Sequence, residues 1–238
     1  MSLTVTDLSY SYGAKTALSE VSFAVPEGRF AALLGPNGAG KSTLYGLLTG
    51  LFSAPSGQIR VAGHDLARNP RAALAVMGVV FQQPTLDLDL SVRQNLRYFA
   101  ALHGLSGRDR DRRIDAALDR LAMRARAGEK ARDLNGGHRR RTEIARAQLH
   151  DPRVLLLDEP TVGLDAAARS AITDHVHALA RDTGLTVLWA THLTDEVLPG
   201  DHLVLLHQGR VLASGTASAL HGTTPLRDWF LSRTAVPA

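Results

Sequence analysis

The stretch Gly35-Pro36-Asn37-Gly38-Ala39-Gly40-Lys41-Ser42-Thr43 decides the fold class of this chain. It matches G-x-x-x-x-G-K-[ST], the P-loop pattern that cradles nucleotide phosphates. A short apolar run at 30–34 precedes it, and leucines at helical spacing follow it. The order of strand, glycine-rich loop and helix therefore agrees with the pattern. One alternative is a glycine-rich turn without a ligand. Another is the dinucleotide fingerprint G-x-G-x-x-G, which needs glycine where Asn37 stands.

The residue types of this stretch suit phosphate binding. Gly35, Gly38 and Gly40 permit backbone angles that other residues avoid, so that successive N–H groups can turn toward a phosphate. The following helix adds the positive end of its dipole. Lys41 is expected to contact the β- and γ-phosphates, and the Ser42 hydroxyl is expected to bind Mg²⁺.

The composition indicates a chain that folds around a sizeable core. Of its 238 residues 45% are hydrophobic, enough for one large domain or for a core with one or two inserted lobes. Aromatic residues make up 5%, which argues against a surface that stacks nucleic-acid bases. The net charge of +4 is a weak sign of anionic partners, and the lack of cysteine excludes disulfides and cysteine–zinc sites.

The absence of membrane and export signals predicts a cytosolic protein. No apolar stretch approaches the roughly 20 residues needed to cross a bilayer. Residues 1–6 carry neither the charged nor the apolar region that begins a secretory signal. Any contact with a membrane is therefore expected to go through another chain.

The hydrophobic pattern predicts an α/β fold. Alternating residues at 3–8 and 17–25 indicate two antiparallel strands ahead of the P-loop strand, separated by a turn at 10–13. Continuous aliphatic runs at 154–158 and 186–190 indicate strands buried on both faces, as in a parallel sheet. Further strands are expected at 58–62, 77–81, 202–206 and 210–213. Helices are expected at 71–75, from Ser91, through 114–121 with an Arg/Asp-rich solvated face at 108–113, at 139–149, after Asp165, at 217–220 and at 226–231.

Polar side chains follow two of the buried strands. Asp158 ends the run 154–158, where ligands bind in open α/β sheets, and its carboxylate is a hard ligand for Mg²⁺. Glu159 comes next, and a carboxylate beside a metal–nucleotide site can orient or deprotonate an attacking water. His192 ends the neighbouring strand, which favours a contact with the γ-phosphate. The alternatives are an acid that caps the following turn and a histidine that serves as a structural hydrogen-bonding group.

Taken in order, these motifs resemble the nucleotide-binding subunit of ABC transporters over nearly the whole chain, from about Leu3 to Gly215. The segments that carry the resemblance are Walker A at 35–43, the signature at 134–138, Walker B at 155–158 and the D-loop at 163–165. Walker A alone indicates only a P-loop NTPase. The signature shortly before Walker B makes the resemblance specific.

The resemblance implies a role for each matching residue. Glu159 looks like the catalytic glutamate, His192 like the switch histidine, Gln82 like the Q-loop glutamine and Tyr12 like the aromatic that stacks on adenine. The implied catalytic residues are Glu159, His192, Lys41 and Gln82, and the implied Mg²⁺ ligands are Ser42, Gln82 and Asp158. The implied ATP-binding residues are Tyr12, Gly35, Pro36, Asn37, Gly38, Ala39, Gly40, Lys41, Ser42, Thr43, Asn135, Gly136, Gly137 and Asp165.

The resemblance also implies a fold and a mechanism. The fold is a P-loop NTPase core with a mainly parallel sheet, an N-terminal antiparallel β-subdomain and an inserted α-helical subdomain at about 84–150, all within a single domain 1–238. Two cassettes, identical or different, pair head to tail with each ATP between the P-loop of one and Gly136-Gly137 of the other. Hydrolysis loosens the pair, and the motion passes to a membrane-spanning permease near Gln82. The implied location is cytoplasmic, on the inner face of the cell membrane, and no nucleic-acid partner is expected.

The signature departs from the usual L-S-G-G-Q at Asn135 and His138. An Asn amide can donate a hydrogen bond to a γ-phosphate, and Asn is as good a helix N-cap as Ser. We therefore expect a working signature. Tyr10 is an alternative to Tyr12 for stacking on adenine, although Tyr12 fits the family spacing better.

The run 134–141, together with 161–165, looks most like exporter-type cassettes. Within that group the chain resembles cassettes associated with pyrroloquinoline-quinone-dependent alcohol oxidation. One alternative function is that of a soluble ABC protein acting on ribosomes or DNA, but such proteins usually carry two cassettes or a long coiled coil, and no sustained heptads occur here. A small-molecule P-loop kinase is a third class, which leaves 134–138 and His192 without a role.

Overall fold

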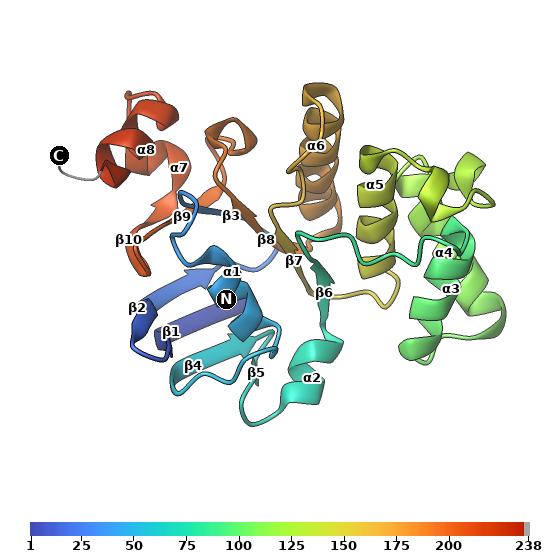
Figure 1. Cartoon of the computed structure of the whole chain (residues 1–238), viewed down its shortest axis with the longest axis horizontal. Helices are drawn as coiled ribbons and strands as arrows, with labels where there is room; N and C mark the ends of the chain where they lie inside the picture. The colour runs from blue at the N-terminus through green and yellow to red at the C-terminus, as the bar shows by residue number, and fades with distance from the viewer. Residues whose placement is uncertain (236–238) are drawn as a thin grey trace.

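The computed structural model describes residues 1–235, and a twisted sheet runs through its centre (Figure 1). Within these residues the sheet has six strands in the order β10-β9-β3-β8-β7-β6. The strands from β9 to β6 are parallel to their neighbours, and β10 returns antiparallel to β9 in the expected hairpin. The strand bounds are β3 (Phe30–Leu34), β6 (Met77–Val80), β7 (Val154–Asp158), β8 (Thr186–Thr191), β9 (His202–His207) and β10 (Arg210–Thr216).

The central strands are buried on both faces, as their continuous aliphatic runs predict. On β3, Phe30 and Leu34 belong to the core on one side of the sheet, whereas Leu33 belongs to the core on the other side. The same alternation places Leu157 and Leu156 of β7 in opposite cores. Each fully buried aliphatic side chain contributes roughly 1.5–3 kcal/mol, so the two cores fix the sheet whose carboxyl ends carry the site.

A second, antiparallel sheet forms from the N-terminal part of the chain, in the order β2-β1-β4-β5. The predicted turn at 10–13 is wrong in its first three residues, because β1 continues to Tyr12, which pairs with Lys15. Tyrosine favours a half-buried strand surface, and the chain reverses only at Gly13, whose φ is +58°. The bounds are β1 (Leu3–Tyr12), β2 (Lys15–Val25), β4 (Ser56–Val61) and β5 (His64–Asp65).

Helices α3, α4 and α5 form a lobe beside β6, opposite the C-terminal helices in the view of Figure 1. Ser91 caps α3 in the predicted capping box, with its hydroxyl accepting from Gln94 N and the Gln94 side chain accepting from Ser91 N. These helices lie within the segment 84–150, whose limits as a subdomain remain a prediction. The bounds are α3 (Val92–Leu102), α4 (Gly107–Arg120) and α5 (Gly136–Ala147), with short 3₁₀ turns at η1 (Arg124–Arg126) and η2 (Ala131–Asp133).

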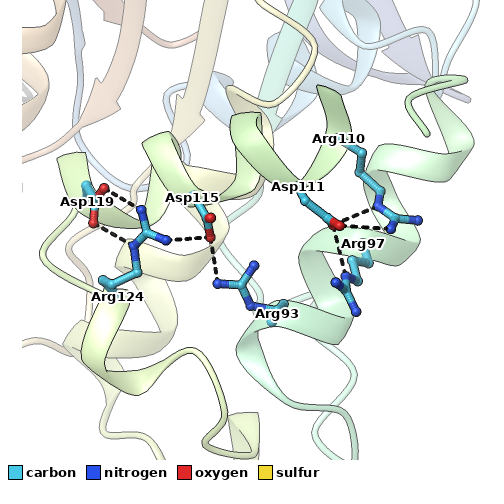
Figure 2. Close-up of polar contacts among 7 residues, drawn as sticks. All are labelled: Arg93, Arg97, Arg110, Asp111, Asp115, Asp119 and Arg124. Atoms are coloured by element: carbon cyan, nitrogen blue, oxygen red, sulfur yellow. Dashed lines mark hydrogen bonds and ion pairs between the residues drawn. The ribbon is translucent and has the colours of Figure 1, made fainter. Parts of the chain in front are cut away.

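The helix predicted with an Arg/Asp-rich face at 108–113 begins at Gly107. Ion pairs surround this charged run, and we call the two groups of pairs that join α3, α4 and η1 the arginine–aspartate ladder (Figure 2). The helix predicted from Arg139 begins at Gly136, because Asn135 caps it. The ladder consists of Arg93, Arg97, Arg110, Asp111, Asp115, Asp119 and Arg124.

The remaining helices flank the central sheet. Asp165 caps α6 as predicted, accepting a hydrogen bond from Ala168 N at 2.8 Å. Among residues 1–235, no helix combines the length and the apolar character needed to cross a membrane. The bounds are α1 (Lys41–Leu48), α2 (Pro70–Ala75), α6 (Ala166–Thr183), η3 (Thr194–Glu196), α7 (Ala217–His221) and α8 (Leu226–Thr234).

Candidate nucleotide site

A cleft of about 790 Å³ opens where β3, β7 and β8 end and α1 begins. Ligands bind at this edge of open α/β sheets. Most of the lining comes from residues that the sequence predicts to bind nucleotide or to act in hydrolysis. They are Tyr12, Asn37, Gly38, Gly40, Lys41, Ser42, Thr43, Gln82, Glu159 and His192.

The glycines of the P-loop are required for two different reasons. Gly40 has a φ of +108°, which L side chains rarely adopt, and its N–H stands at the start of α1. Gly35 does not have a positive φ, so the expected reason is wrong for this residue. A Cβ at Gly35 would lie 2.4 Å from the carbonyl oxygen of Leu206, and close approach of two backbones is what excludes a side chain there.

Lys41 is buried at the floor of the cleft, with 5% of its surface exposed. Its Nζ donates to the carbonyl oxygens of Gly35 at 2.7 Å and Pro36 at 3.2 Å. It also lies 3.0 Å from Oε1 of Glu159. A buried ammonium needs such partners, and together they fix this charge beneath the space that a phosphate would fill.

Glu159 follows β7 with a φ of +44°, in the left-handed region that non-glycine residues seldom occupy. Its N–H donates to the carbonyl oxygen of Ala190 on β8, which holds the turn in place. The carboxylate lies between two side chains: Oε1 contacts Nζ of Lys41, and Oε2 lies 3.5 Å from Nδ1 of His192. Backbone strain of this kind persists where the surrounding structure enforces it, and here it aims the carboxylate into the cleft.

Asp158 ends β7 and is 6% exposed. Its Oδ1 is buried without a hydrogen-bond partner. Burial, together with the negative charge of Glu159, raises the pKa of Asp158 to about 6, against the effects of Lys41, Arg140 and the Ser42 hydroxyl. An unpartnered carboxylate oxygen beside a hydroxyl is the donor set that a hard divalent cation prefers, so Asp158 and Ser42 fit Mg²⁺.

Tyr12, rather than the alternative Tyr10, lines the cleft. Tyr12 is 48% exposed, and its ring meets the Tyr10 ring edge-on, with 5.0 Å between centroids. Its hydroxyl lies 3.5 Å from Oγ1 of Thr43. A half-exposed aromatic ring beside the P-loop offers a stacking surface for a base.

A second group of predicted residues lies together, outside the residues that line the cleft. We call Asn135, Gly136, Gly137 and Asp165 the signature surface. A Cβ at Gly136 would stand 3.1 Å from Leu164, and one at Gly137 would stand 3.3 Å from Ala168, so the signature packs against the D-loop and the first turn of α6 of its own chain. The Asn135 side chain accepts a hydrogen bond from His138 N at 2.9 Å, which confirms its predicted role as a helix cap.

The sequence analysis missed Glu196, which joins two segments of the site. This carboxylate is 2% exposed and accepts hydrogen bonds from Trp189 Nε1 at 2.9 Å and from the hydroxyls of Thr191 and Thr161. It therefore ties the segment after Glu159 to the residue before His192. Nothing in the sequence pattern marks a single glutamate in a short 3₁₀ turn.

The cleft also has walls that the sequence analysis did not assign. The first residues of β2 contribute Lys15, Thr16 and Ala17, and the turn between β9 and β10 contributes Gln208 and Gly209. The strand and the turn are joined because Ser19 N of β2 donates to the carbonyl oxygen of Gly209. Pairing between such distant segments has no local signal in the sequence.

Comparison with known proteins agrees with this geometry. The family model described as "ABC transporter" matches residues 18–162. Nod factor export ATP-binding protein I of Paraburkholderia xenovorans is 39% identical over 211 residues, which are 88% of this chain and 69% of that protein. Daunorubicin resistance ATP-binding protein DrrA3 of Streptomyces coeruleorubidus is 38% identical over 223 residues, which are 93% of this chain and 70% of that protein.

Solved structures show the same fold over nearly the full chain. An ATP-binding subunit of an ABC transporter is 30% identical with a TM-score of 0.85, covering 98% of this chain and 99% of that one. The protein cbiO1 from Clostridium perfringens, part of the ABC transporter complex cbiONQ, is 29% identical with a TM-score of 0.86, covering 98% and 95%. A dimeric ATP-binding cassette in a post-hydrolysis state with ADP and Pi is 26% identical with a TM-score of 0.79, covering 90% and 98%.

The family, the fold and the relatives confirm the transport function over the alternative of an ABC protein acting on ribosomes or DNA. The narrower resemblance to cassettes of quinone-dependent alcohol oxidation stays a prediction. The chain belongs to the ABC transporter family, as an exporter-type ATP-binding subunit that couples ATP hydrolysis to transport.

Proposed function

We propose that this chain powers export by hydrolysing Mg–ATP in the cleft at the carboxyl end of β3, β7 and β8. One observation supports the proposal above all: Lys41, Glu159 and His192 line the same cleft, and the Glu159 carboxylate lies 3.0 Å from the Lys41 ammonium and 3.5 Å from the His192 imidazole. Phosphoryl transfer to water needs a base or orienting group, a fixed positive charge and a cradle for phosphate. Each requirement has a side chain or backbone segment in this cleft.

Each residue of the cleft would have a distinct task. Glu159 would orient the attacking water and accept its proton, while Lys41 and His192 would face the charge that develops on the γ-phosphate. Tyr12 would stack on the adenine, and residues 35–43 would hold the phosphates. Ser42, Asp158 and Gln82 would hold Mg²⁺, which neutralises charge on the β- and γ-phosphates.

The signature surface would act on the ATP of a second cassette, which is identical to this chain or different from it. Asn135, Gly136 and Asp165 are exposed, and they lie outside the lining of the cleft among the residues that the structure describes. Free backbone N–H groups at the start of α5 and the Asn135 amide suit a γ-phosphate. Each ATP would therefore favour the closed pair, and hydrolysis would release it.

We further propose that a membrane-spanning permease chain carries the exported substrate. The cassette would lie at the cytoplasmic face of the membrane through that partner. The names of the relatives support this, since a Nod factor export protein and a daunorubicin resistance protein are among them. The region near Gln82 and the helices of the 84–150 lobe would receive the permease.

The test is a tagged pull-down from detergent-solubilised native membranes, using Glu159→Gln with Mg–ATP to hold the closed state. Co-purified chains are identified by mass spectrometry. We expect a stoichiometric polytopic membrane protein, which then becomes the place to look for the substrate. Recovery of ribosomal or DNA-bound proteins with no membrane chain would contradict the proposal.

A further inference from the structure

Charged side chains on α5 form hydrogen bonds with the loop that follows β6. Arg140 donates from Nη1 to the carbonyl oxygen of Phe81 at 2.7 Å and from Nη2 to that of Gln82 at 2.8 Å. Oε1 of Glu143 accepts from the Thr85 N–H at 2.6 Å. We call Arg140, Glu143 and Arg146 the loop clamp.

The loop clamp leaves little freedom to Thr85. Its N–H and its hydroxyl both donate to Glu143, and its carbonyl oxygen accepts from Nη1 of Arg146 at 3.0 Å. Its hydroxyl oxygen also accepts a bond from Nη2 of Arg146. Every backbone polar group of this residue is thus bound to α5 rather than to neighbours along the loop.

The clamp is built around a buried ion pair. Arg140 is 6% exposed and Glu143 is 2% exposed, and Nη1 of Arg140 lies 2.9 Å from Oε2 of Glu143. Burial lowers the pKa of Arg140, while the carboxylates of Glu143 and Asp158 oppose that effect. Two buried charges are costly unless geometry and further hydrogen bonds compensate, so the pair depends on the carbonyl and amide groups of the loop.

The position of the clamp gives it access to both halves of the site. Arg140 lies three residues after Gly137 on the same helix, one turn from the signature surface. Gln82, whose carbonyl oxygen Arg140 holds, lines the cleft. A displacement of the first turn of α5 therefore moves the backbone that carries the Gln82 side chain.

We propose that Arg140 and Glu143 are positioning residues for Gln82, and that the loop clamp transmits contact at the signature surface to the cleft of the same chain. This inference rests on the proposed function, in which the signature surface binds the ATP of a second cassette. ATP held by one cassette would thereby set the position of Gln82 in the other. The two ATP sites of the pair are then coupled through α5.

The test replaces the buried pair by apolar side chains in the full chain, as Arg140→Met with Glu143→Met. Such replacements usually keep a protein folded, whereas removing one partner leaves a buried charge unpaired. The matched control is Arg93→Met, which breaks a partly buried ion pair of the ladder that does not contact the loop (Figure 2). Steady-state ATPase rates, Mg–ATP binding by calorimetry and amide exchange at 81–85 are measured for each.

We expect kcat to fall about tenfold or more in the double variant while KM and Kd for Mg–ATP stay within about threefold, since the P-loop is untouched. Mg–ATP should slow amide exchange at 81–85 in the unmodified chain and in Arg93→Met, but not in the double variant. A kcat within about twofold of the unmodified value would overturn the proposal. An equal loss in Arg93→Met would overturn it as well.

A conservative variant keeps the proposal testable if the double variant does not fold. Glu143→Gln retains an acceptor for the Thr85 N–H but loses the charge opposite Arg140, and we expect a smaller loss of kcat in the same direction. No loss in a folded Glu143→Gln, with amide exchange at 81–85 faster than in the unmodified chain, would overturn the inference. Full turnover in Glu159→Gln would instead overturn the proposed function, so the two failures are distinguishable.

Discussion

The cleft and the signature surface are two parts of one molecule that differ in what they lack. The cleft holds the buried Lys41 ammonium at the start of α1, with the Glu159 carboxylate and the His192 imidazole after two neighbouring strands. The signature surface presents two glycines, the Asn135 amide and the Asp165 carboxylate, and oxygens of these two side chains are already used to cap α5 and α6. The cleft has the groups for chemistry, whereas the signature surface has groups only for contact. From this difference we infer that the cleft of one cassette and the signature surface of a second cassette would together complete one ATP site.

The largest effect is expected from Glu159→Gln in the cleft. The amide keeps the shape of the side chain but cannot accept a proton, so ATP turnover should fall by a factor on the order of 10³. Binding of Mg–ATP should persist, because residues 35–43 are unchanged. Phosphate release measures the turnover and calorimetry measures the binding. Turnover close to that of the unmodified chain would remove Glu159 from its proposed role.

The next two variants distinguish the cleft from the signature surface, because one should lose ATP binding and the other should lose turnover. Lys41→Ala should abolish ATP binding, because it removes the buried charge at the floor of the cleft. Gly137→Asp should leave binding by the isolated chain within about threefold but lower turnover by about 100-fold, since it places a negative charge where a γ-phosphate of the second cassette would lie. Binding and turnover are measured as above. If Gly137→Asp lost ATP binding to the same extent as Lys41→Ala, the two regions would not be separate.

A smaller effect concerns a buried pair remote from both regions. Burial alone would lower the pKa of His177, but its hydrogen bond to Asp201 at 2.9 Å and the charge of that carboxylate raise the pKa above 6.5. A raised pKa in the folded state means that the protonated histidine stabilises the fold. This stability should be full below pH 6.5 and should be lost as the pH rises through the raised pKa of His177.

Urea unfolding at several pH values tests this expectation against His177→Gln. The variant keeps a donor for Asp201 but has no titrating group, so its free energy of unfolding should change less between pH 6 and 8. A pH dependence that is identical in the variant would assign the effect to other groups. Neither outcome alters the comparison of the cleft with the signature surface, which is why this pair serves as a reference.

The smallest effect is expected on the arginine–aspartate ladder of the helical lobe (Figure 2). Arg93 Nη2 lies 2.6 Å from Asp115, with 27% and 35% of the two side chains exposed. Exposed and partly exposed pairs contribute little, so Arg93→Met should change the free energy of unfolding by less than about 1 kcal/mol. The change should shrink further in 1 M salt, because screening weakens it. A larger change that salt does not affect would contradict this ranking.

The sequence predicts the elements whose signals are local. The P-loop, the buried strands that end at Asp158 and Thr191, and the caps at Asn135 and Asp165 all depend on neighbouring residues. The sequence predicts a turn at 10–13, whereas β1 extends through Tyr12. The local signal is ambiguous because two tyrosines next to a glycine are typical of both a strand end and a turn. The roles of the individual site residues stay predictions.

The sequence does not predict the contacts that join distant segments. Arg140 reads as part of a basic run, yet it is buried against a loop 58 residues away. Glu196 reads as an exposed acid of a short turn, yet it binds Trp189, Thr191 and Thr161. Buried polar side chains of this kind are decided by tertiary packing, for which periodicity carries no signal.

The most direct test of the central claim is the mass of Glu159→Gln in solution with saturating Mg–ATP, measured by light scattering during size-exclusion chromatography. The account predicts a species of twice 25.5 kDa, which returns to 25.5 kDa when Gly137→Asp is added although ATP binding is kept. This result would place the signature surface of one cassette against the ATP of another. A mass of 25.5 kDa for Glu159→Gln at saturating Mg–ATP, or a dimer that Gly137→Asp leaves intact, would contradict it.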